Sequence, residues 1–249
     1  MWNYKIGLFI PCYIDQLYPQ AGIAALATLR RLGLNVSCPP NQQCCGQPLA
    51  NSGASCETVS LCRKFADLFA EYDYVVCPSS SCVYHVRHNY ERIARSEKVE
   101  KICDSTYELC EFIVDILQIE DMKLYFPHRV GIHHSCHGLR GLELASTGEI
   151  IQTRYSKVDS LLEKAEGISL TRLDREDECC GFGGVFSVFE PHISVRMGSD
   201  KLNDHLRNGS EFITATDMSC LMHLEGIIRR RKEKVKVVHV AEILQTCRL

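Results

Sequence analysis

Cysteine is the residue type in this chain whose number and spacing point most directly to chemistry. The chain has 15 cysteines among 249 residues, and two pairs of them are adjacent and followed by glycine. Adjacent cysteines make poor disulfide partners, because their Cα atoms lie about 3.8 Å apart whereas a relaxed disulfide spans about 4.4–6.8 Å. In a reducing compartment, clustered cysteines more often bind a metal or carry out redox chemistry. We therefore expect these thiols to serve a metal or redox centre.

Eight of the cysteines fall into two series in which the same motifs follow in the same order. Each series contains a single cysteine, then a Cys-Cys-Gly triplet, then a Ser-Cys pair with a histidine three residues after its cysteine. The first series comprises Cys12, Cys44, Cys45 and Cys82, and the second comprises Cys136, Cys179, Cys180 and Cys220. This recurrence indicates an internal duplication into two similar lobes, since each repeat is too long for a solenoid unit.

Each series offers four thiolates, and these suit two kinds of metal centre. Neighbouring thiolates can each bind a different iron of an iron-sulfur cluster, whereas structural zinc sites usually use pairs with C-x-x-C spacing. The adjacent cysteines favour one or two iron-sulfur clusters per chain and leave zinc open as a substitute. Glycines beside the thiols allow backbone amides to approach the sulfurs; they are Gly46, Gly181, Gly183 and Gly184. All eight cysteines are the predicted cofactor and metal ligands.

Histidines and one arginine near these cysteines are candidates for further roles. His137 follows the first cysteine of the second series, and His85 and His223 lie three residues beyond the last cysteine of each series. An imidazole can hydrogen-bond to sulfur or relay the proton that leaves a hydroxy acid. The guanidinium of Arg140 has the geometry to hold a carboxylate. Helix packing and solvation explain the same residues, so His137, Arg140 and His223 remain candidates and the catalytic residues are left unassigned.

The elements expected around these motifs are strands that alternate with helices. The predicted strands are Lys5–Ile10, Asn35–Cys38, Tyr74–Cys77, Val130–His134, Ile168–Leu173, Phe212–Ala215 and Val235–His239. The predicted helices are Pro19–Leu32, Cys56–Tyr72, Glu143–Tyr155, His192–Arg207, Leu221–Arg231 and Val240–Cys247. The strand before Cys136 ends in His133 and His134, one of which can point to the loops and the other into a core. Cysteines that follow such strands lie where a parallel sheet gathers its ligand-binding loops.

The fold class that this alternation predicts is α/β, with two similar Rossmann-like lobes formed by residues 1–125 and 126–249. Mostly parallel sheets with helices on both faces are expected. Hydrophobic residues make up 45% of the chain and charged residues 24%, as in globular proteins, and a formal net charge of −3 disfavours a nucleic-acid partner. No apolar run reaches the roughly 18 residues of a membrane span, and no secretory signal is recognisable, so we expect a cytoplasmic protein.

On these motifs the chain resembles the cysteine-rich CCG-domain family, which includes heterodisulfide reductase B-type subunits and iron-sulfur subunits of glycolate and lactate oxidation. The segments similar to its lactate-utilization members are Phe9–Gln16, Cys44–Pro48, His133–Arg140, Cys179–Gly184 and Asp217–His223. The resemblance implies an iron-sulfur oxidoreductase subunit that takes part in oxidising L-lactate, or a related 2-hydroxy acid such as glycolate, to the 2-oxo acid. It also implies two partners, a ferredoxin-type iron-sulfur subunit and a third lactate-utilization subunit.

The chain departs from the family pattern at one position in each lobe. The family has a further cysteine three residues before the last one, and Ser79 and Asp217 occupy the matching positions here. The remaining four thiols per lobe can hold an ordinary 4Fe-4S cluster, with Asp217 as a possible non-thiolate ligand. Cys77 is either a replacement ligand or a core residue. The cysteines without a counterpart are expected to be packing or incidental thiols; they are Cys38, Cys56, Cys62, Cys103, Cys110 and Cys247.

Two other functions stay open at this stage. A non-catalytic subunit that relays electrons or assists assembly would carry the same cysteines, with fully thiolate-ligated clusters near the surface. A catalytic subunit would instead place an open iron site and a basic side chain in one pocket. A zinc-stabilised interaction module is the second alternative. No G-x-G-x-x-G motif follows a predicted strand, so the sequence gives no support for a nicotinamide or flavin held by that motif.

Overall fold

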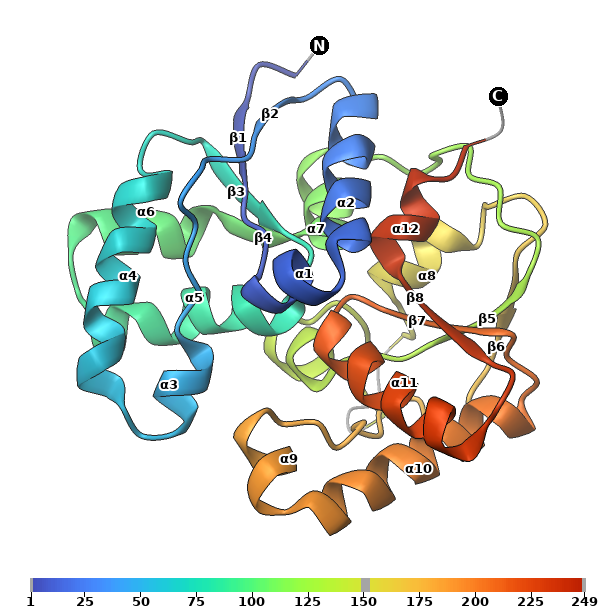
Figure 1. The fold of residues 1–249 in the computed structure, drawn as a ribbon. Helices are drawn as coiled ribbons and strands as arrows, with labels where there is room; N and C mark the ends of the chain where they lie inside the picture. Colours follow the sequence, from blue (N-terminus) through green and yellow to red (C-terminus); the bar gives the residue numbers. More distant parts are fainter. Residues whose placement is uncertain (1, 149–152, 248–249) are drawn as a thin grey trace.

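Two four-stranded parallel sheets form the framework of the chain in the computed structural model, which describes residues 2–148 and 153–247 (Figure 1). The first sheet has the strand order β2-β1-β3-β4 and the second has the order β6-β5-β7-β8. The strands are β1 Lys5–Leu8, β2 Asn35–Ser37, β3 Tyr74–Cys77, β4 Thr106–Glu108, β5 Arg129–Ile132, β6 Ser169–Thr171, β7 Phe212–Ala215 and β8 Lys236–His239. The two sheets therefore share one topology, and the α/β fold with two similar lobes is confirmed.

Helices follow the strands in both lobes. In the first lobe they are α1 Cys12–Leu17, α2 Pro19–Arg31, α3 Gln47–Asn51, α4 Ser55–Phe69, α5 Ser80–Ile93, α6 Glu97–Ser105 and α7 Leu109–Glu111, which continues into the π-helical turn η1 Phe112–Ile116. In the second lobe they are the π-helical turn η2 His137–Gly141 and α8 Lys157–Leu162, α9 Val185–Phe189, α10 Pro191–Arg207, α11 Met218–Arg231 and α12 Val240–Gln245. Proline at the first position of α2 and α10 fixes the backbone angle that starts each helix.

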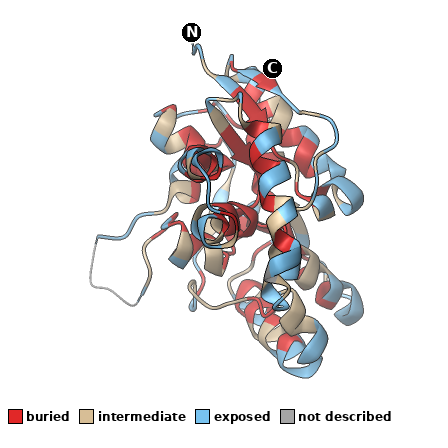
Figure 2. Ribbon diagram, turned by 90° about the vertical axis from the view of Figure 1, so that its left-hand side faces the viewer, coloured by how far each residue is buried: buried red, intermediate tan, exposed pale blue. Residues whose placement is uncertain are grey.

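The central strands are buried on both faces. In β1, the consecutive residues Ile6, Gly7 and Leu8 are all buried, although neighbouring side chains in a strand point to opposite faces. Both faces of the sheet must therefore be covered, as parallel sheets require. Figure 2 shows buried residues on the strands and on the inner sides of the helices, with exposed residues on the outer sides.

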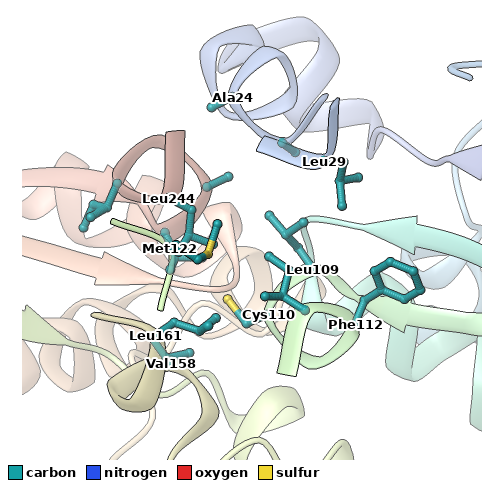
Figure 3. Packing of buried hydrophobic residues seen from close by; sticks show 14 of the residues in the cluster. Ala24, Leu29, Leu109, Cys110, Phe112, Met122, Val158, Leu161 and Leu244 are labelled. Carbon is teal, nitrogen blue, oxygen red and sulfur yellow. The ribbon is translucent and has the colours of Figure 1, made fainter. Parts of the chain in front are cut away.

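The hydrophobic core is shared between the lobes. The central cluster joins residues of both sheets, including Ile6 and Val130, and Figure 3 shows side chains from both lobes within it. The last helix of each lobe packs against the other lobe, since α12 contacts α2 and α7 contacts α8. The guanidinium of Arg31 donates to the carbonyl of Leu244 at 2.6 Å across the first of these contacts. The two lobes are therefore joined by an exchange of helices.

Most of the predicted elements are present, with differences of a few residues at their ends. One strand of the first sheet, β4, was not predicted, because it has three residues and one of them is the charged Glu108. The predicted helix Glu143–Tyr155 is wrong for residues 143–148 and 153–155, whereas residues 149–152 lie outside the described part of the chain. Glu143 has a positive φ of 51°, and Ser146 and Tyr155 exchange hydrogen bonds between extended segments. These cross-links replace the helical bonds.

No helix within residues 2–148 and 153–247 has both the length and the hydropathy needed to cross a membrane.

Candidate metal centres

The structure brings the first four predicted ligands together at the C-terminal edge of the first sheet. We call Cys12, Cys44, Cys45 and Cys82 the first quartet. Cys12 begins α1 just after β1, the adjacent pair precedes α3, and Cys82 lies in the first turn of α5 after β3. Hydrogen bonds link Cys44 to both Cys12 and Cys45. The Sγ atoms of Cys45 and Cys82 are 3.5 Å apart. One series of thiols distant in sequence thus forms one connected group.

The second quartet repeats this arrangement in the other lobe. It comprises Cys136, Cys179, Cys180 and Cys220. Cys136 directly precedes η2, the adjacent pair precedes α9, and Cys220 lies in the first turn of α11 after β7. Hydrogen bonds link Cys179 to Cys136 and to Cys180, and Cys180 in turn to Cys220. The duplication seen in the sequence is therefore matched by the geometry of the thiols.

The electrostatics of each quartet fit a centre that carries positive charge. Hydrogen bonds from the thiols of Cys12 and Cys45, and one from the amide of Gly46 at 3.4 Å, lower the pKa of Cys44. The pKa values of Cys12 and Cys45 are raised, chiefly because each donates its proton to Cys44 and is partly or fully buried. Four thiolates this close would repel one another unless a cation neutralised them. A metal ion or an iron-sulfur cluster supplies that charge, so this donor set fits such a group.

The Cys-Cys-Gly loops need glycine for a geometric reason. Gly46 and Gly181 have φ values of 90° and 87°, which place both in the left-handed region. In this conformation each glycine amide donates to the first thiol of its pair, at 3.4 Å for Cys44 and 3.3 Å for Cys179. A Cβ atom on Gly181 would lie 2.7 Å from the carbonyl oxygen of Ser194. The glycines therefore shape the loop that presents the adjacent cysteines.

The two positions at which the chain departs from the family pattern are helix N-caps. Ser79 caps α5 by accepting from the amide of Cys82 at 3.4 Å, and Asp217 caps α11 by accepting from the amide of Ser219 at 3.4 Å. The last cysteine of each quartet is then the third residue of its helix. The partial positive charge at a helix N-terminus favours the thiolate form of a nearby cysteine, whereas burial acts in the opposite direction and the pKa of both Cys82 and Cys220 is raised. Serine and aspartate thus stabilise the helices that carry Cys82 and Cys220.

These caps meet at the interface between the lobes. The hydroxyl of Tyr13 donates to Oδ1 of Asp217 at 2.9 Å and lies 2.8 Å from Oγ of Ser79. The amide of Ser80 donates to the carbonyl of Thr216 at 3.2 Å, and their hydroxyls lie 2.6 Å apart. The N-termini of α5 and α11 therefore face each other, with one quartet on either side.

Hydrogen bonds hold both carboxylate oxygens of Asp217. Its Oδ1 accepts from Tyr13 and from the hydroxyl and amide of Ser219, and its Oδ2 accepts from the amide of Ser81 at 2.8 Å. Three of these donors share Oδ1, whereas Oδ2 accepts one hydrogen bond and keeps a lone pair. Asp217 is thus a helix cap and an acceptor at the interface, and its role as a non-thiolate ligand stays a prediction.

Cys77, the possible replacement ligand, is a core residue in contact with the first quartet. It is fully buried at the end of β3 and packs in the same hydrophobic cluster as Phe9 and Val83. Its thiol also hydrogen-bonds with that of Cys82. Of the cysteines without a counterpart, three are buried and three are exposed. The buried ones are Cys62, Cys103 and Cys110, and the exposed ones are Cys38, Cys56 and Cys247.

The three catalytic candidates lie in different surroundings. Nδ1 of His137 is 3.8 Å from Sγ of Cys136, and its ring lies against Tyr84. Nε2 of His223 lies 3.2 Å from the carbonyl of Ser194, and burial lowers the pKa of this histidine. Arg140 is exposed and donates to the carbonyl of Asp177 at 3.3 Å. His137 therefore lies within hydrogen-bonding distance of a quartet thiol.

Two further histidines border the quartets. His85 is buried beside the first quartet, and burial lowers its pKa to about 4 although the negative charge of Cys44 acts in the opposite direction. His133 is buried beside the second quartet, where one of its ring nitrogens lies within 4.8 Å of the sulfurs of Cys180 and Cys220. The sequence places His133 at the end of a strand and leaves its role unassigned. The available signal was its position three residues before Cys136.

A cavity of about 620 Å³ opens at the C-terminal edge of the second sheet, close to but separate from the second quartet. Its lining includes His134, Arg154 and Arg172. The guanidinium of Arg154 forms an ion pair with Glu176 at 2.6 Å. None of the eight cysteines is among the described residues that line the cavity. The lining also includes Asp159, Glu163 and Glu176, so the cavity carries groups of both charges, and a molecule bound in it would not touch the thiols directly.

Comparison with known proteins agrees with the duplication. The model of the cysteine-rich domain family CCG matches residues 6–87 and again residues 130–225. The chain is 36% identical to lactate utilization protein A of Halalkalibacterium halodurans over 245 residues, which cover 96% of each chain. It is 36% identical to the protein of that name in Exiguobacterium sp. over 96% of each chain. For Bacillus pumilus the identity is 35%, over 97% of this chain and 99% of the relative.

Proposed function

Because this chain belongs to the cysteine-rich CCG-domain family, we propose that it acts in lactate utilization as an iron-sulfur subunit. It takes part in oxidising L-lactate, or a related 2-hydroxy acid such as glycolate, to the 2-oxo acid. It passes the electrons to a ferredoxin-type iron-sulfur subunit and works with a third lactate-utilization subunit in the cytoplasm. The names of the relatives, which match over almost the full chain, support this role.

The observation that carries the proposal is the pair of matched thiol quartets. Each quartet offers four sulfurs, which is the number that an ordinary 4Fe-4S cluster uses. Such a cluster, when bound, exchanges single electrons at a potential set by its ligands and hydrogen bonds. The eight cysteines would hold one cluster in each lobe, and the interface between α5 and α11 would keep the two close together.

The surroundings of the quartets support electron exchange with a partner protein. Cys12 is exposed and Cys136 is partly exposed, whereas Cys45 and Cys220 are buried. One side of each quartet is thus accessible to a docking protein, and the other side is enclosed. The amides of the Cys-Cys-Gly loops and the N-termini of α5 and α11 direct partial positive charge at the sulfurs, which favours the more negative, reduced state of a bound cluster.

A relay subunit is the second candidate, and one observation favours it over direct catalysis. The cavity with two arginines has no quartet cysteine in its described lining, and Arg140 donates to a backbone carbonyl. A hydroxy acid bound in that cavity would not contact the sulfurs. In this version another subunit removes two protons and two electrons from the hydroxy acid, and this chain passes the electrons on one at a time.

Metal analysis tests the cofactor. The chain is purified without oxygen, and its iron, acid-labile sulfide and zinc are measured together with its electron paramagnetic resonance spectrum. We expect about four iron and four sulfide per quartet. Cys45→Ser and Cys180→Ser should each lose about half of the iron, whereas Cys38→Ser, an exposed cysteine outside the quartets, should lose none. Stoichiometric zinc without sulfide would replace this proposal by the zinc-stabilised interaction module.

Turnover assays test the role of the subunit. The cluster-loaded chain is mixed with L-lactate and an artificial electron acceptor, first alone and then with its two partner subunits. Turnover by the chain alone would establish that it is catalytic. Turnover by the mixture only, lost when Cys180→Ser replaces the wild-type chain, would support the relay.

A further inference from the structure

The two lobes carry different residues at one equivalent position beside the quartets. Three residues before the first cysteine of each quartet stand Phe9 in the first lobe and His133 in the second. Both follow the central strand of their sheet and make the same backbone bond to the neighbouring strand. The amide of Phe9 donates to Val76 at 2.9 Å, and the amide of His133 donates to Thr214 at 2.7 Å. The backbone places both side chains equivalently, and only their chemistry differs.

The imidazole of His133 is buried with both ring nitrogens lacking a protein partner. The residue is 1% exposed, and neither Nδ1 nor Nε2 has a hydrogen-bond partner among the described residues. Buried polar atoms in native proteins are nearly always satisfied, so two such atoms on one ring require an explanation. The charged and titratable groups that act on the ring are Lys201, His205, Cys179 and His134. A bound metal that takes the lone pair of one ring nitrogen would supply a missing partner.

The position of the ring fits a metal ligand. One of its nitrogens and the sulfurs of Cys180 and Cys220 all lie within 4.8 Å of one another. Metal–sulfur bonds of about 2.3 Å and metal–nitrogen bonds of about 2.0–2.1 Å place two donors of one tetrahedral metal within this range. Phe9 offers no donor, and its ring packs edge-on against Phe65 at 4.9 Å between centroids.

We propose that His133 supplies an imidazole nitrogen to the metal centre of the second quartet, so that the chain holds two centres of different ligation. The first centre is bound by four thiolates, and in the second the imidazole takes the place of one thiolate, so that each centre keeps four protein ligands. This inference rests on the proposed function for the identity of the metal, but the role of His133 applies to any metal that the quartet binds. A neutral imidazole near a cluster raises the reduction potential relative to thiolate. Electrons therefore pass from the first lobe to the second.

Pulsed electron paramagnetic resonance tests the ligand directly. Protein reconstituted with iron and sulfide without oxygen is reduced, and nitrogen couplings are compared for unlabelled protein and protein grown with ¹⁵N-histidine. We expect a coupling of the size that directly bound imidazole gives. It should be a ¹⁴N coupling in the unlabelled protein and a ¹⁵N coupling in the labelled protein. No folding question arises, because the sequence is unaltered. A spectrum without a histidine coupling of that size would overturn the proposal.

Variants connect the coupling to one residue. His133→Phe copies the first lobe and should abolish the coupling, whereas His134→Gln, a substitution at the neighbouring position, should keep it. His133→Cys should also abolish the coupling and lower the potential of the second centre, while the iron content stays at the wild-type level. A coupling that survives His133→Phe would assign the nitrogen to another residue and refute the proposal.

The metal content separates a failure of this inference from a failure of the proposed function. If the purified chain contains zinc without sulfide, the iron-sulfur role fails, and the role of His133 is measured by zinc X-ray absorption. A zinc–nitrogen distance of about 2.0–2.1 Å that His133→Phe removes would support the inference. A zinc environment that is the same in wild type and variant would overturn it.

Discussion

Tyr13 connects the two residues at which the chain departs from its family. Its hydroxyl lies between Ser79 in one lobe and Asp217 in the other, at 2.8 and 2.9 Å. Both partners are buried, so removal of the hydroxyl leaves their oxygens without water to replace it. Tyr13→Phe should lower the free energy of unfolding by about 1–2 kcal/mol. Urea denaturation of the metal-free, reduced chain measures this change.

A double-mutant cycle isolates the interaction. Tyr13→Phe and Ser79→Ala are combined, and their effects on the free energy of unfolding should not add, because each substitution removes the same contact. Tyr155→Phe combined with Ser79→Ala is the control, since the exposed hydroxyl of Tyr155 donates to the carbonyl of Glu143, away from Ser79. Additive effects of the first pair would contradict the connection through Tyr13.

Among the individual residues, the grouping of the thiols could be predicted from the sequence, whereas the contacts of the residues around them could not. The eight cysteines could be grouped because the same motifs recur in the same order. The bonds of Asp217 could not be predicted, because its partner Tyr13 is 204 positions away and comes from the other lobe. The role of His133 could not be assigned, because its burial and unpartnered nitrogens appear only once the strands are paired. Local spacing predicts ligands, whereas tertiary contacts decide what surrounds them.

Among the elements, the Cys-Cys-Gly loop depends on its glycine. Gly181→Ala would place a Cβ 2.7 Å from the carbonyl oxygen of Ser194 and strain a backbone with a φ of 87°. We expect it to cost more than about 1 kcal/mol of stability and to lower the metal content of the second quartet. Gly226→Ala is the matched control, because Gly226 lies in α11 with nothing within 4 Å of the new Cβ.

The control should change stability in the opposite direction. Alanine in a helix interior is favoured over glycine by about 1 kcal/mol, so Gly226→Ala should stabilise the chain and leave its metal content unchanged. Thermal unfolding and iron analysis of both variants check the pair. Equal metal content in Gly181→Ala and wild type would show that the loop conformation is not needed for binding.

The helices that end the two lobes use different caps. Glu108 caps α7 and His239 caps α12, each with a glutamate three residues later that completes a capping box. Burial raises the pKa of Glu108 to about 8 from its ordinary 4.5, despite amide hydrogen bonds that act in the opposite direction. The folded chain therefore holds a proton that the unfolded chain releases. The stability that protonated Glu108 contributes is complete below pH 4.5 and is lost as the pH rises towards 8.

Glu108→Gln should remove this pH dependence. A neutral amide keeps an oxygen for the cap and cannot ionise. Between pH 4.5 and pH 7, the free energy of unfolding of the variant should therefore fall by about 3 kcal/mol less than that of wild type. Urea denaturation across this range gives both profiles. Buried histidines contribute equally to both proteins, so the difference between the profiles reports Glu108. Parallel profiles would contradict the raised pKa.

Element prediction succeeded where one local signal was strong. Apolar runs such as that of β1 identify central strands, because both faces of a parallel sheet are covered. The short β4 carries the charged Glu108, and no apolar run marks it. The segment from Glu143 was predicted as a helix from its composition, but bonds between Ser146 and Tyr155 hold it in another conformation. Pairings of this kind override local preference.

The whole molecule is built so that neither lobe encloses its own core. Leu142 and Leu144 of the second lobe pack in the cluster of the first, and Ile14 and Ala21 of the first pack in that of the second. The duplication is therefore present in the structure as well as in the sequence, since each lobe packs side chains into the hydrophobic cluster of the other. This exchange fixes the interface that lies between the two quartets, because a close-packed interior transmits little slack.

The division into two lobes, predicted at residues 125 and 126, can be tested by separating them. The link between residues 118 and 121 is the better point to cut, because the amide of Phe126 and the carbonyl of Leu124 already bond with Glu166 of the second lobe.

Residues 1–120 and 121–249 are expressed separately and together. Each half alone should expose the apolar surface that the exchanged helices cover, and it should aggregate or remain unfolded. Expressed together, the halves should associate one to one and unfold cooperatively, as gel filtration and circular dichroism would measure. A half that is monomeric and unfolds cooperatively by itself would mean that the shared core is dispensable, and that each quartet is held by an autonomous domain.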